Sequence, residues 1–275
     1  MTQRLHALLA LVALGLAVLG LAVLVPAALA TPARAETEVD VALVIAVDIS
    51  YSMDLEELAL QREGFAEAFR SALVQDAIRR GVLGRIAVVY FEWAGAADQR
   101  IVVPWTVIDG AGAAHAFADR VAAVPVRRAQ RTSISAAIDF GAKALAEGGF
   151  AAARRVIDVS GDGPNNQGRV VTQARDDAAA AGITVNGLPL MLKQPGYFDI
   201  PDLDLYYKAC VIGGPGAFVV PVRDRAQLRE AIKTKVLLEV AGLVPPEAPL
   251  VRPAQGEAAP NCLAGEAQWR ERMGN

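Results

Sequence analysis

Apolar runs alternate along the chain with segments whose apolar residues recur at helical spacing. The run at 39–47 is almost continuously apolar and rich in β-branched residues, which is typical of a strand buried on both faces of a parallel sheet. The segment 54–78 has helical periodicity and predicts one helix. Its apolar stripe consists of Leu58, Phe65, Phe69, Ala72 and Leu73.

The same alternation continues through the rest of a domain that we place at 36–242. Further strands are predicted at 85–91, 101–103, 155–159, 183–190 and 217–222, and further helices at 113–121, from 134 onward, at 170–181, near 203–209 and at 226–240. The link between the second and third strands is too short for a crossover helix, so this pair should be antiparallel. The pattern predicts an α/β fold with a doubly wound, mostly parallel sheet, one antiparallel edge strand and helices on both faces, as in Rossmann-like folds.

The first 35 residues have the features of an export signal. Arg4 precedes an uncharged apolar run at 7–25, and the small-residue patterns 28–30 and 33–35 follow. We predict cleavage after Ala35. A permanent N-terminal anchor is the alternative, because an apolar run of this length can span a bilayer. Either outcome exports the domain, to the periplasm, the cell surface or the medium, and a membrane contact is expected only if the segment is not cleaved.

Composition argues against several function classes. Without residues 1–35 the chain carries 25 basic and 30 acidic residues, and this negative balance, with no basic block, argues against nucleic acid as a partner. Only His115, Cys210 and Cys262 then remain as histidine or cysteine, too few for a zinc site built from those ligands. The phosphate-loop, dinucleotide-binding and serine-hydrolase motifs are absent as well. Neither an enzymatic activity nor a small-molecule substrate is therefore expected.

One polar motif follows the first predicted strand. Asp48, Ser50 and Ser52 form a D-x-S-x-S sequence directly before the first helix. On an extended segment, alternate residues point to one side, so one carboxylate and two hydroxyls can converge. The carboxyl ends of the strands are also where open α/β sheets bind ligands. These oxygen ligands suit Mg²⁺, with Mn²⁺ or Ca²⁺ also possible.

This motif resembles the start of the metal-ion-dependent adhesion site (MIDAS) of von Willebrand factor A domains. That family completes its site with a threonine before a middle helix and an aspartate after the next strand, and Thr132 and Asp162 match these positions. The resemblance implies that Ser50, Ser52 and Thr132 ligate the ion directly, while Asp48 and Asp162 act largely through water. It covers 39–240, and stretches such as FEWAG also resemble a single-domain subfamily of exported bacterial proteins of unknown function.

A site of this kind favours binding over catalysis. Neutral hydroxyls leave much of the charge of a dication unneutralised, so a carboxylate from a partner can join its coordination shell. We therefore expect a metal-dependent protein-binding module whose partner presents an Asp or Glu side chain. Two alternatives stay open: a Mg²⁺-dependent hydrolase that uses the same oxygens, and a structural subunit of an envelope assembly.

Other residues near the motifs also permit simpler interpretations. Asp48, the two serines or Thr132 could cap helices. The basic loop of Arg127, Arg128 and Arg131 is either solvated or contacts an acidic partner, and the loop at 164–166 is expected to shape the rim of the site.

The tail at 243–275 is proline-rich, with one possible short helix near Gln268. In an exported chain Cys210 and Cys262 are the only possible intramolecular disulfide pair, and this bond would attach the tail to the domain.

Overall fold

The computed structural model describes residues 36–194, 196, 200–245 and 260–274. The predicted signal segment, its cleavage point after Ala35 and the alternative anchor lie outside the described residues. Within the described part of the chain, no helix is both long and apolar enough to cross a membrane.

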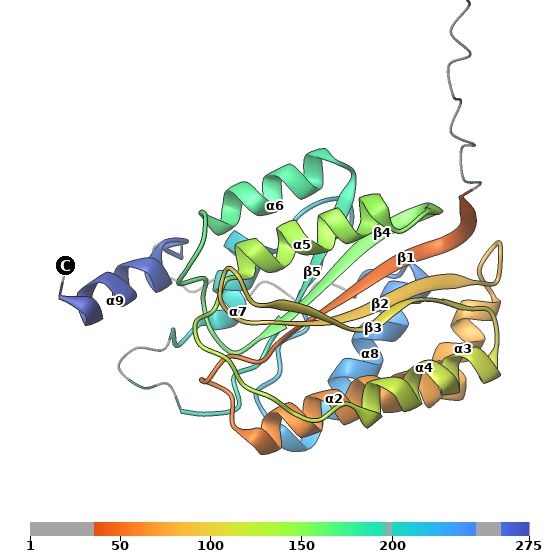
Figure 1. The fold of residues 1–275 in the computed structure, drawn as a ribbon, viewed down its shortest axis with the longest axis horizontal. Helices are drawn as coiled ribbons and strands as arrows, with labels where there is room; N and C mark the ends of the chain where they lie inside the picture. The colour runs from red at the N-terminus through yellow and green to blue at the C-terminus, as the bar shows by residue number, and fades with distance from the viewer. Residues whose placement is uncertain (1–35, 195, 197–199, 246–259, 275) are drawn as a thin grey trace, which may run out of the picture. The chain divides into compact units, whose positions relative to one another are not determined.

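Five strands form one sheet in the order β3-β2-β1-β4-β5. They are β1 (Thr37–Asp48), β2 (Ile86–Trp93), β3 (Gln99–Ile108), β4 (Phe150–Gly161) and β5 (Ile183–Pro189). The central strand β1 pairs in parallel with β2 and β4, β5 is parallel to β4, and β3 is antiparallel to β2 (Figure 1). The predicted fold class, including the antiparallel edge strand, is confirmed.

Helices cover both faces of this sheet (Figure 1). One face packs against α2 (Leu55–Arg70), α3 (Ala72–Arg79), α4 (Ala111–Ala123) and α8 (Leu228–Ala241). The other packs against α5 (Ile134–Glu147), α6 (Val171–Ala180) and α7 (Leu203–Tyr206), which continues into the π-helical turn Tyr207–Val211. A 3₁₀ turn, Arg225–Gln227, leads into α8, and α9 (Ala264–Met273) follows near the C-terminus. Because β1 is buried between the two layers, its side chains are apolar on both faces.

Two predicted elements differ from the structure. The single helix predicted at 54–78 is two helices, because Ser71 is extended (φ −67°, ψ 126°) and shifts the helical phase. Leu73 is consequently 55% exposed, and Val74 and Ile78 enter the core instead. The strand predicted at 217–222 makes only isolated bridges to the β5 side of the sheet. Pro221 has no N–H to donate to a ladder there.

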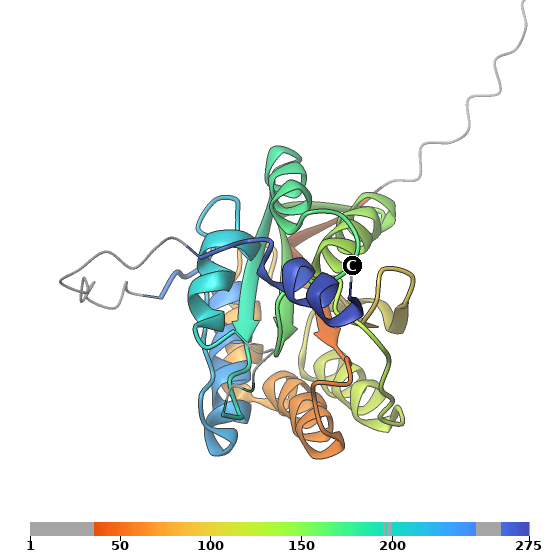
Figure 2. The same cartoon turned by 90° about the vertical axis from the view of Figure 1, so that its left-hand side faces the viewer.

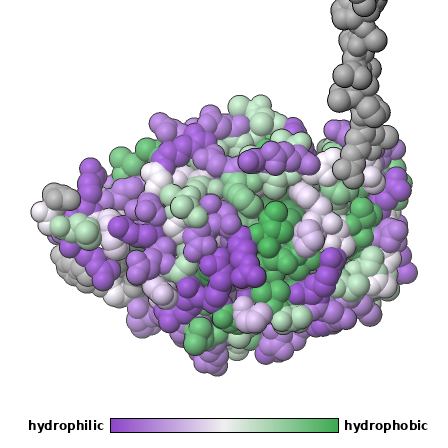
Figure 3. Space-filling view, in the orientation of Figure 1, coloured by the Kyte–Doolittle hydropathy of each residue, from purple (hydrophilic) through white to green (hydrophobic). Residues whose placement is uncertain are grey.

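The edge strand β3 leaves apolar side chains at the surface. Figure 3 shows an apolar patch along this edge of the sheet, and Ile101 on β3 is 45% exposed. Polar side chains surround the patch, so it stays a limited feature of an otherwise polar face.

A fully buried ionic cluster lies between the sheet and α8. The Lys235 ammonium pairs with Asp158 on β4 and with Glu239 one turn along α8, where Nζ and Oε1 are 2.5 Å apart. Asn186 on β5 donates to the same Glu239 oxygen at 3.1 Å. Two carboxylates thus share one ammonium group away from water. Burial, followed by the charge of Asp158, raises the pKa of Glu239 to about 7.

This raised pKa makes stability depend on pH. The native state keeps the Glu239 proton between the usual glutamate pKa and about 7, whereas the unfolded chain releases it. This contribution is complete below about pH 4.5 and is lost as pH rises to about 7, a change of about 3 kcal/mol. Glu239→Gln should therefore flatten the pH dependence of thermal unfolding and make the protein more stable than wild type at pH 8. Parallel pH profiles for the two proteins would contradict this prediction.

Candidate metal site

The first part of the site is the end of β1. Asp48 is the last residue of the strand and is fully buried, and the Ser50 backbone N–H donates to its Oδ1 at 2.7 Å. The other carboxylate oxygen, Oδ2, is buried without a hydrogen-bond partner in the described structure. Helix capping does not explain this motif, since the N-cap of α2 is Asp54, which forms a capping box with Glu57.

A chain of side-chain oxygens connects this motif to the end of β4. The Ser50 and Ser52 hydroxyls are 2.8 Å apart, and the Ser52 hydroxyl donates to Asp162 Oδ1 at 2.5 Å. Ser50 is almost fully buried, whereas Ser52 is exposed. The parallel pairing of β1 with β4 thus brings together polar residues that are more than a hundred positions apart in sequence.

Thr132 reaches the same place from the loop before α5. Its backbone N–H donates to Asn166 Oδ1 at 2.9 Å, and its carbonyl accepts from the Asn166 N–H at 2.8 Å. Thr132, Ser52 and Asp162 line one surface depression, and Asn166 lies beside them. The rim loop at 164–166 therefore fixes the backbone of Thr132. The N-cap of α5 is Ser133 rather than Thr132, so capping does not account for the threonine either.

The surroundings of Asp48 disfavour the negative charge of its carboxylate. Burial raises the pKa of Asp48 well above its usual value, the nearby charge of Asp162 adds to this effect, and hydrogen bonds from Ser50 reduce it. A cation beside the two carboxylates would relieve both the desolvation and the repulsion. No group of three or more His, Cys, Asp or Glu side chains suited to a metal occurs in the described residues. An ion at this site would therefore depend on hydroxyl ligands, a donor set that fits a hard dication.

Gly161 and Tyr207 also shape the site, and the sequence pattern did not single them out. A Cβ on Gly161 would lie 2.9 Å from both Asp48 Oδ2 and the Tyr207 hydroxyl. That hydroxyl is also buried without a hydrogen-bond partner among the described residues. The pKa of Tyr207 is raised well above its usual value, by burial first and then by the charge of Asp48. The glycine thus leaves room for two buried polar groups beside the oxygen chain.

Gly161→Ala should weaken Mg²⁺ binding about tenfold or more, because the added methyl group displaces the Asp48 carboxylate. Gly112→Ala on α4 is the matched control, since a Cβ there meets no atom within 4 Å. Calorimetric titration with Mg²⁺ measures both variants. Unchanged Mg²⁺ affinity in Gly161→Ala would show that this carboxylate position is not needed for the ion.

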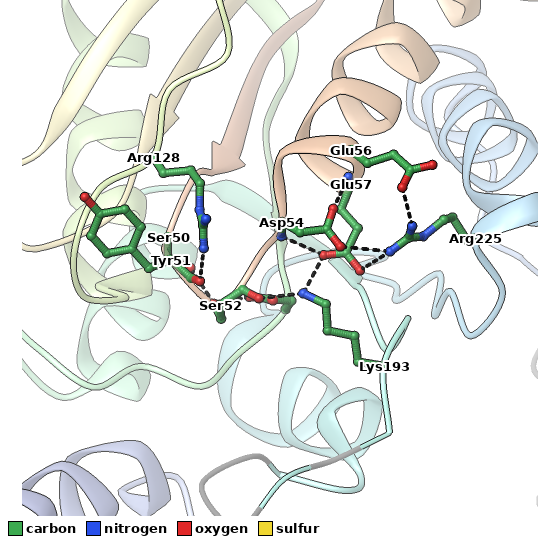
Figure 4. A network of polar contacts seen from close by, with 10 residues as sticks. Ser50, Tyr51, Ser52, Asp54, Glu56, Glu57, Arg128, Lys193 and Arg225 are labelled. Carbon is green, nitrogen blue, oxygen red and sulfur yellow. Dashed lines mark hydrogen bonds and ion pairs between the residues drawn. The ribbon is translucent and has the colours of Figure 1, made fainter.

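A network of charged side chains contacts the Ser52 turn and the start of α2 (Figure 4). Lys193 Nζ donates to the Ser52 carbonyl oxygen and pairs with buried Glu57, at 2.6 Å in each case. Arg225 pairs with Glu57 and Asp54 at 2.9 and 3.0 Å. The two cations come from far along the chain, so no local pattern could predict their place. Together they tie the start of α2 to the loops after β5 and before α8.

The three arginines of the basic loop have different roles. Arg127 pairs with Asp98 at 2.9 Å and with fully buried Glu92 at 3.2 Å, so its contacts are internal. Arg128 donates to the Tyr51 carbonyl and lies over the Tyr51 ring (Figure 4). Arg131 lies over the ring of Trp269, 3.4 Å from its centroid.

The predicted disulfide is present in the structure. Cys210 and Cys262 are bonded, with their Cα atoms 5.5 Å apart, and no free cysteine remains in the described chain. The bond joins the turn after α7 to the segment before α9 and thereby attaches the C-terminal helix to the domain.

Several solved structures have a similar fold. They include proximal thread matrix protein 1 from the mussel byssus (TM-score 0.54, 14% identity, 74% of this chain and 48% of that chain). The pilus adhesin SpaC from Lactobacillus rhamnosus GG matches with TM-score 0.57 and 10% identity over 76% of this chain and 32% of that one. A von Willebrand factor type A protein from Catenulispora acidiphila matches with TM-score 0.50 and 15% identity over 75% and 43%. This chain thus spans less than half the length of each.

These similarities show that the chain has the von Willebrand factor A fold. At the level of sequence, the family model described as "Protein of unknown function (DUF1194)" matches residues 38–244. The chain therefore belongs to that family. A search of curated proteins found no match. One further structure of the mussel protein, at TM-score 0.50, has a zinc-occupied MIDAS motif.

Proposed function

We propose that this protein is an exported, metal-dependent binding module whose partner presents an Asp or Glu side chain to the ion. The observation that carries the proposal is the arrangement of oxygens at the end of β1. Buried Asp48 Oδ2 lacks a hydrogen-bond partner in the described structure, beside hydroxyls that lead through Ser52 to Asp162. A buried carboxylate oxygen without a partner is unfavourable, and a cation is the group that would satisfy it.

In this proposal Ser50, Ser52 and Thr132 hold Mg²⁺ or a similar dication directly, and Asp48 and Asp162 balance its charge. A bound dication supplies a positive charge that neutral hydroxyls leave largely uncompensated and that a partner carboxylate can bind. The chain's own residues orient the hydroxyls: Asn166 fixes Thr132, and Lys193 fixes the Ser52 turn. Recognition of an acidic side chain then combines charge with a preformed oxygen site.

The surroundings of the site favour binding over catalysis. His115 is exposed on α4 and does not line the depressions at the site. The Lys193 ammonium is already paired with Glu57 and the Ser52 carbonyl. A general base must lie within hydrogen-bond reach of the group that it activates. The names of two similar solved structures, a pilus adhesin and a thread matrix protein, agree with a binding role.

Capture from the native cell envelope tests this proposal. The wild-type domain, cross-linked in Mg²⁺, should retain a partner that is absent when a chelator is present and absent with Asp48→Asn as bait. Changing the key Asp or Glu of that partner to Asn or Gln should weaken capture about as much as removing the ion, because a neutral amide oxygen is a poorer ligand for a dication. Capture that is indifferent to chelator would contradict the proposal.

A further inference from the structure

The C-terminal helix α9 lies over the same edge of the sheet as the candidate metal site. Figure 2 shows it in front of the carboxyl ends of the strands. The disulfide Cys210–Cys262 ends two residues before the helix begins, so it ties α9 to the domain at its N-terminal end.

The helix docks on the rim loop through close packing and a hydrogen bond. Gly265 is buried, and a Cβ there would clash with the Asn165 carbonyl group and lie 3.0 Å from the Pro164 ring. Asn165 Nδ2 donates to Glu266 Oε1 at 2.7 Å. Asn165 is itself fully buried, and its Oδ1 accepts from the Ser135 N–H at 3.0 Å. The loop that positions Thr132 through Asn166 therefore also holds α9.

This docking turns an open face into a groove. Two adjoining depressions share Ser52, Thr132 and Asn166 on one side and Trp269 and Arg272 of α9 on the other. The candidate metal ligands therefore form the floor of the groove, and α9 forms one wall.

The charges along the groove point to an anionic occupant. The charged side chains that line it are Asp162, Arg131 and Arg272. The Arg131 guanidinium stacks on Trp269 at 3.4 Å, and that of Arg272 lies 5.5 Å from the same ring. Stacking occupies the face of the Arg131 guanidinium and leaves its in-plane N–H groups able to bind a carboxylate. With a dication on the floor, positive charge would extend from the metal to the α9 wall.

The backbone conformation of Arg131 indicates that its contact with Trp269 is a fixed part of the structure. Arg131 has φ 74° and is the single non-glycine residue with positive φ in the described structure. This conformation is unfavourable for an arginine and persists only where the surroundings fix it. The Arg131 side chain lies against Trp269, and the residue directly precedes Thr132, so one strained residue connects the α9 wall with the metal site.

We infer that α9 is a specificity-determining wall of the binding groove, and that the partner segment is a peptide with two acidic side chains. One carboxylate binds at the metal, and the second is bound by Arg131 beside Trp269, where Arg272 adds to the positive charge of the α9 wall. This inference rests on the proposed function and deepens it, because it names the second feature that the partner must carry. The charge of the α9 wall, added to that of the ion, favours such a segment over one with a single acid.

Glycine–serine octapeptides that carry one Asp, or two Asp at several spacings, test the inference. Their affinities are measured by NMR titration of the isotope-labelled full chain in MgCl₂ and again with chelator. For wild type, the best two-Asp peptide should bind about tenfold more tightly than the one-Asp peptide, as expected for one added charge-assisted contact. Both affinities should be lost with chelator.

Two variants remove the contribution of α9 in different ways. Gly265→Ala should displace the helix by steric overlap, and Arg272→Gln removes one positive charge of the α9 wall at an exposed position. In each, the advantage of the second Asp should fall to about twofold or less. The measure is the ratio of the two peptide affinities of the same variant, so a change in Mg²⁺ affinity that affects both peptides cancels. Gly112→Ala is the matched control and should keep the full advantage. The Arg272→Gln variant keeps the test decisive if Gly265→Ala does not fold.

Each result separates this inference from the proposed function. Equal Mg²⁺-dependent binding of one-Asp and two-Asp peptides by wild type would overturn the role of α9 and leave the proposed function standing. Absence of Mg²⁺-dependent binding of any peptide would contradict the proposed function and this inference with it. Tighter binding of dextran sulfate than of any peptide, lost in Gly265→Ala, would identify a polyanionic glycan and overturn the peptide assignment.

Discussion

Asp48→Asn is expected to lower Mg²⁺ affinity about 100-fold while the metal-free protein stays at least as stable as wild type. The affinity falls because the substitution removes half of the carboxylate charge of the candidate site, at its most buried position. Stability is kept or increased because burial and the charge of Asp162 raise the pKa of Asp48, so the ionised carboxylate is unfavourable without a cation. Mg²⁺ at about a hundred times its wild-type Kd should then stabilise wild type by about 2.7 kcal/mol and the variant by only about 0.4 kcal/mol.

Asp54→Ala, at a neighbouring carboxylate, is expected to lower stability without changing Mg²⁺ affinity, which is the reverse of the result for Asp48→Asn. Asp54 caps α2, and a hydrogen bond from the Glu57 N–H lowers its pKa. Removing the cap should cost about 1 kcal/mol of stability and leave Mg²⁺ affinity unchanged. Calorimetric titration and thermal unfolding of the two variants measure this crossed pattern. Equal Mg²⁺ affinity in wild type and Asp48→Asn would mean that the aspartate does not contribute to a metal site.

Lys235→Met is expected to destabilise the fold by about 3–5 kcal/mol at pH 8. The ammonium group is fully buried between Asp158 and Glu239, whose side chains are also fully buried. Without it, two carboxylates stay in the core with no balancing charge, although methionine fills much of the same volume. Denaturant unfolding at pH 8 measures the loss.

Lys233→Met is the matched control for that substitution. Lys233 lies two residues earlier on α8, and its partner Glu230 is 67% exposed, so the change should shift stability by no more than about 0.5 kcal/mol. Adding Glu239→Gln to Lys235→Met should recover part of the loss, because it removes one of the two buried charges. A loss below about 1 kcal/mol in Lys235→Met would show that the buried cluster is not a major source of stability.

The sheet could be predicted from sequence because its buried strands are apolar on both faces. The apolar run of β1 predicted the parallel core of the sheet, and the short link before β3 predicted its antiparallel edge strand. The break at Ser71 was not predictable, since the apolar stripe of α2 and that of α3 can be read as one helix. The segment at 217–222 was predicted as a strand, but contacts with distant residues decide how it pairs. Isolated bridges and a hydrogen bond to the Asn186 side chain hold it in place of a regular strand ladder.

The candidate site was predictable where its residues follow strand ends or precede a helix. The structure places Ser52, Thr132 and Asp162 around one depression and buries Asp48 completely. Their role as metal ligands stays a prediction. The supporting residues Tyr207 and Lys193 could not be predicted, because each reaches the site from a distant loop or turn.

The contact of α9 with the site could not be predicted from the sequence either. The two cysteines predicted that the tail is attached, which the structure confirms, but they did not indicate the face on which it lies. That place depends on the absence of a side chain at Gly265 and on the partners of Asn165.

The position of a Mn²⁺ ion, located by anomalous scattering in crystals of the full chain, tests the candidate metal site most directly. Mn²⁺ takes the same oxygen ligands as Mg²⁺ and scatters strongly enough to be assigned. We expect one strong peak bonded to the hydroxyls of Ser50, Ser52 and Thr132, with Asp48 and Asp162 around it, and no such peak in Asp48→Asn crystals. A peak elsewhere with none at these hydroxyls, or an equal peak in the variant, would contradict this expectation.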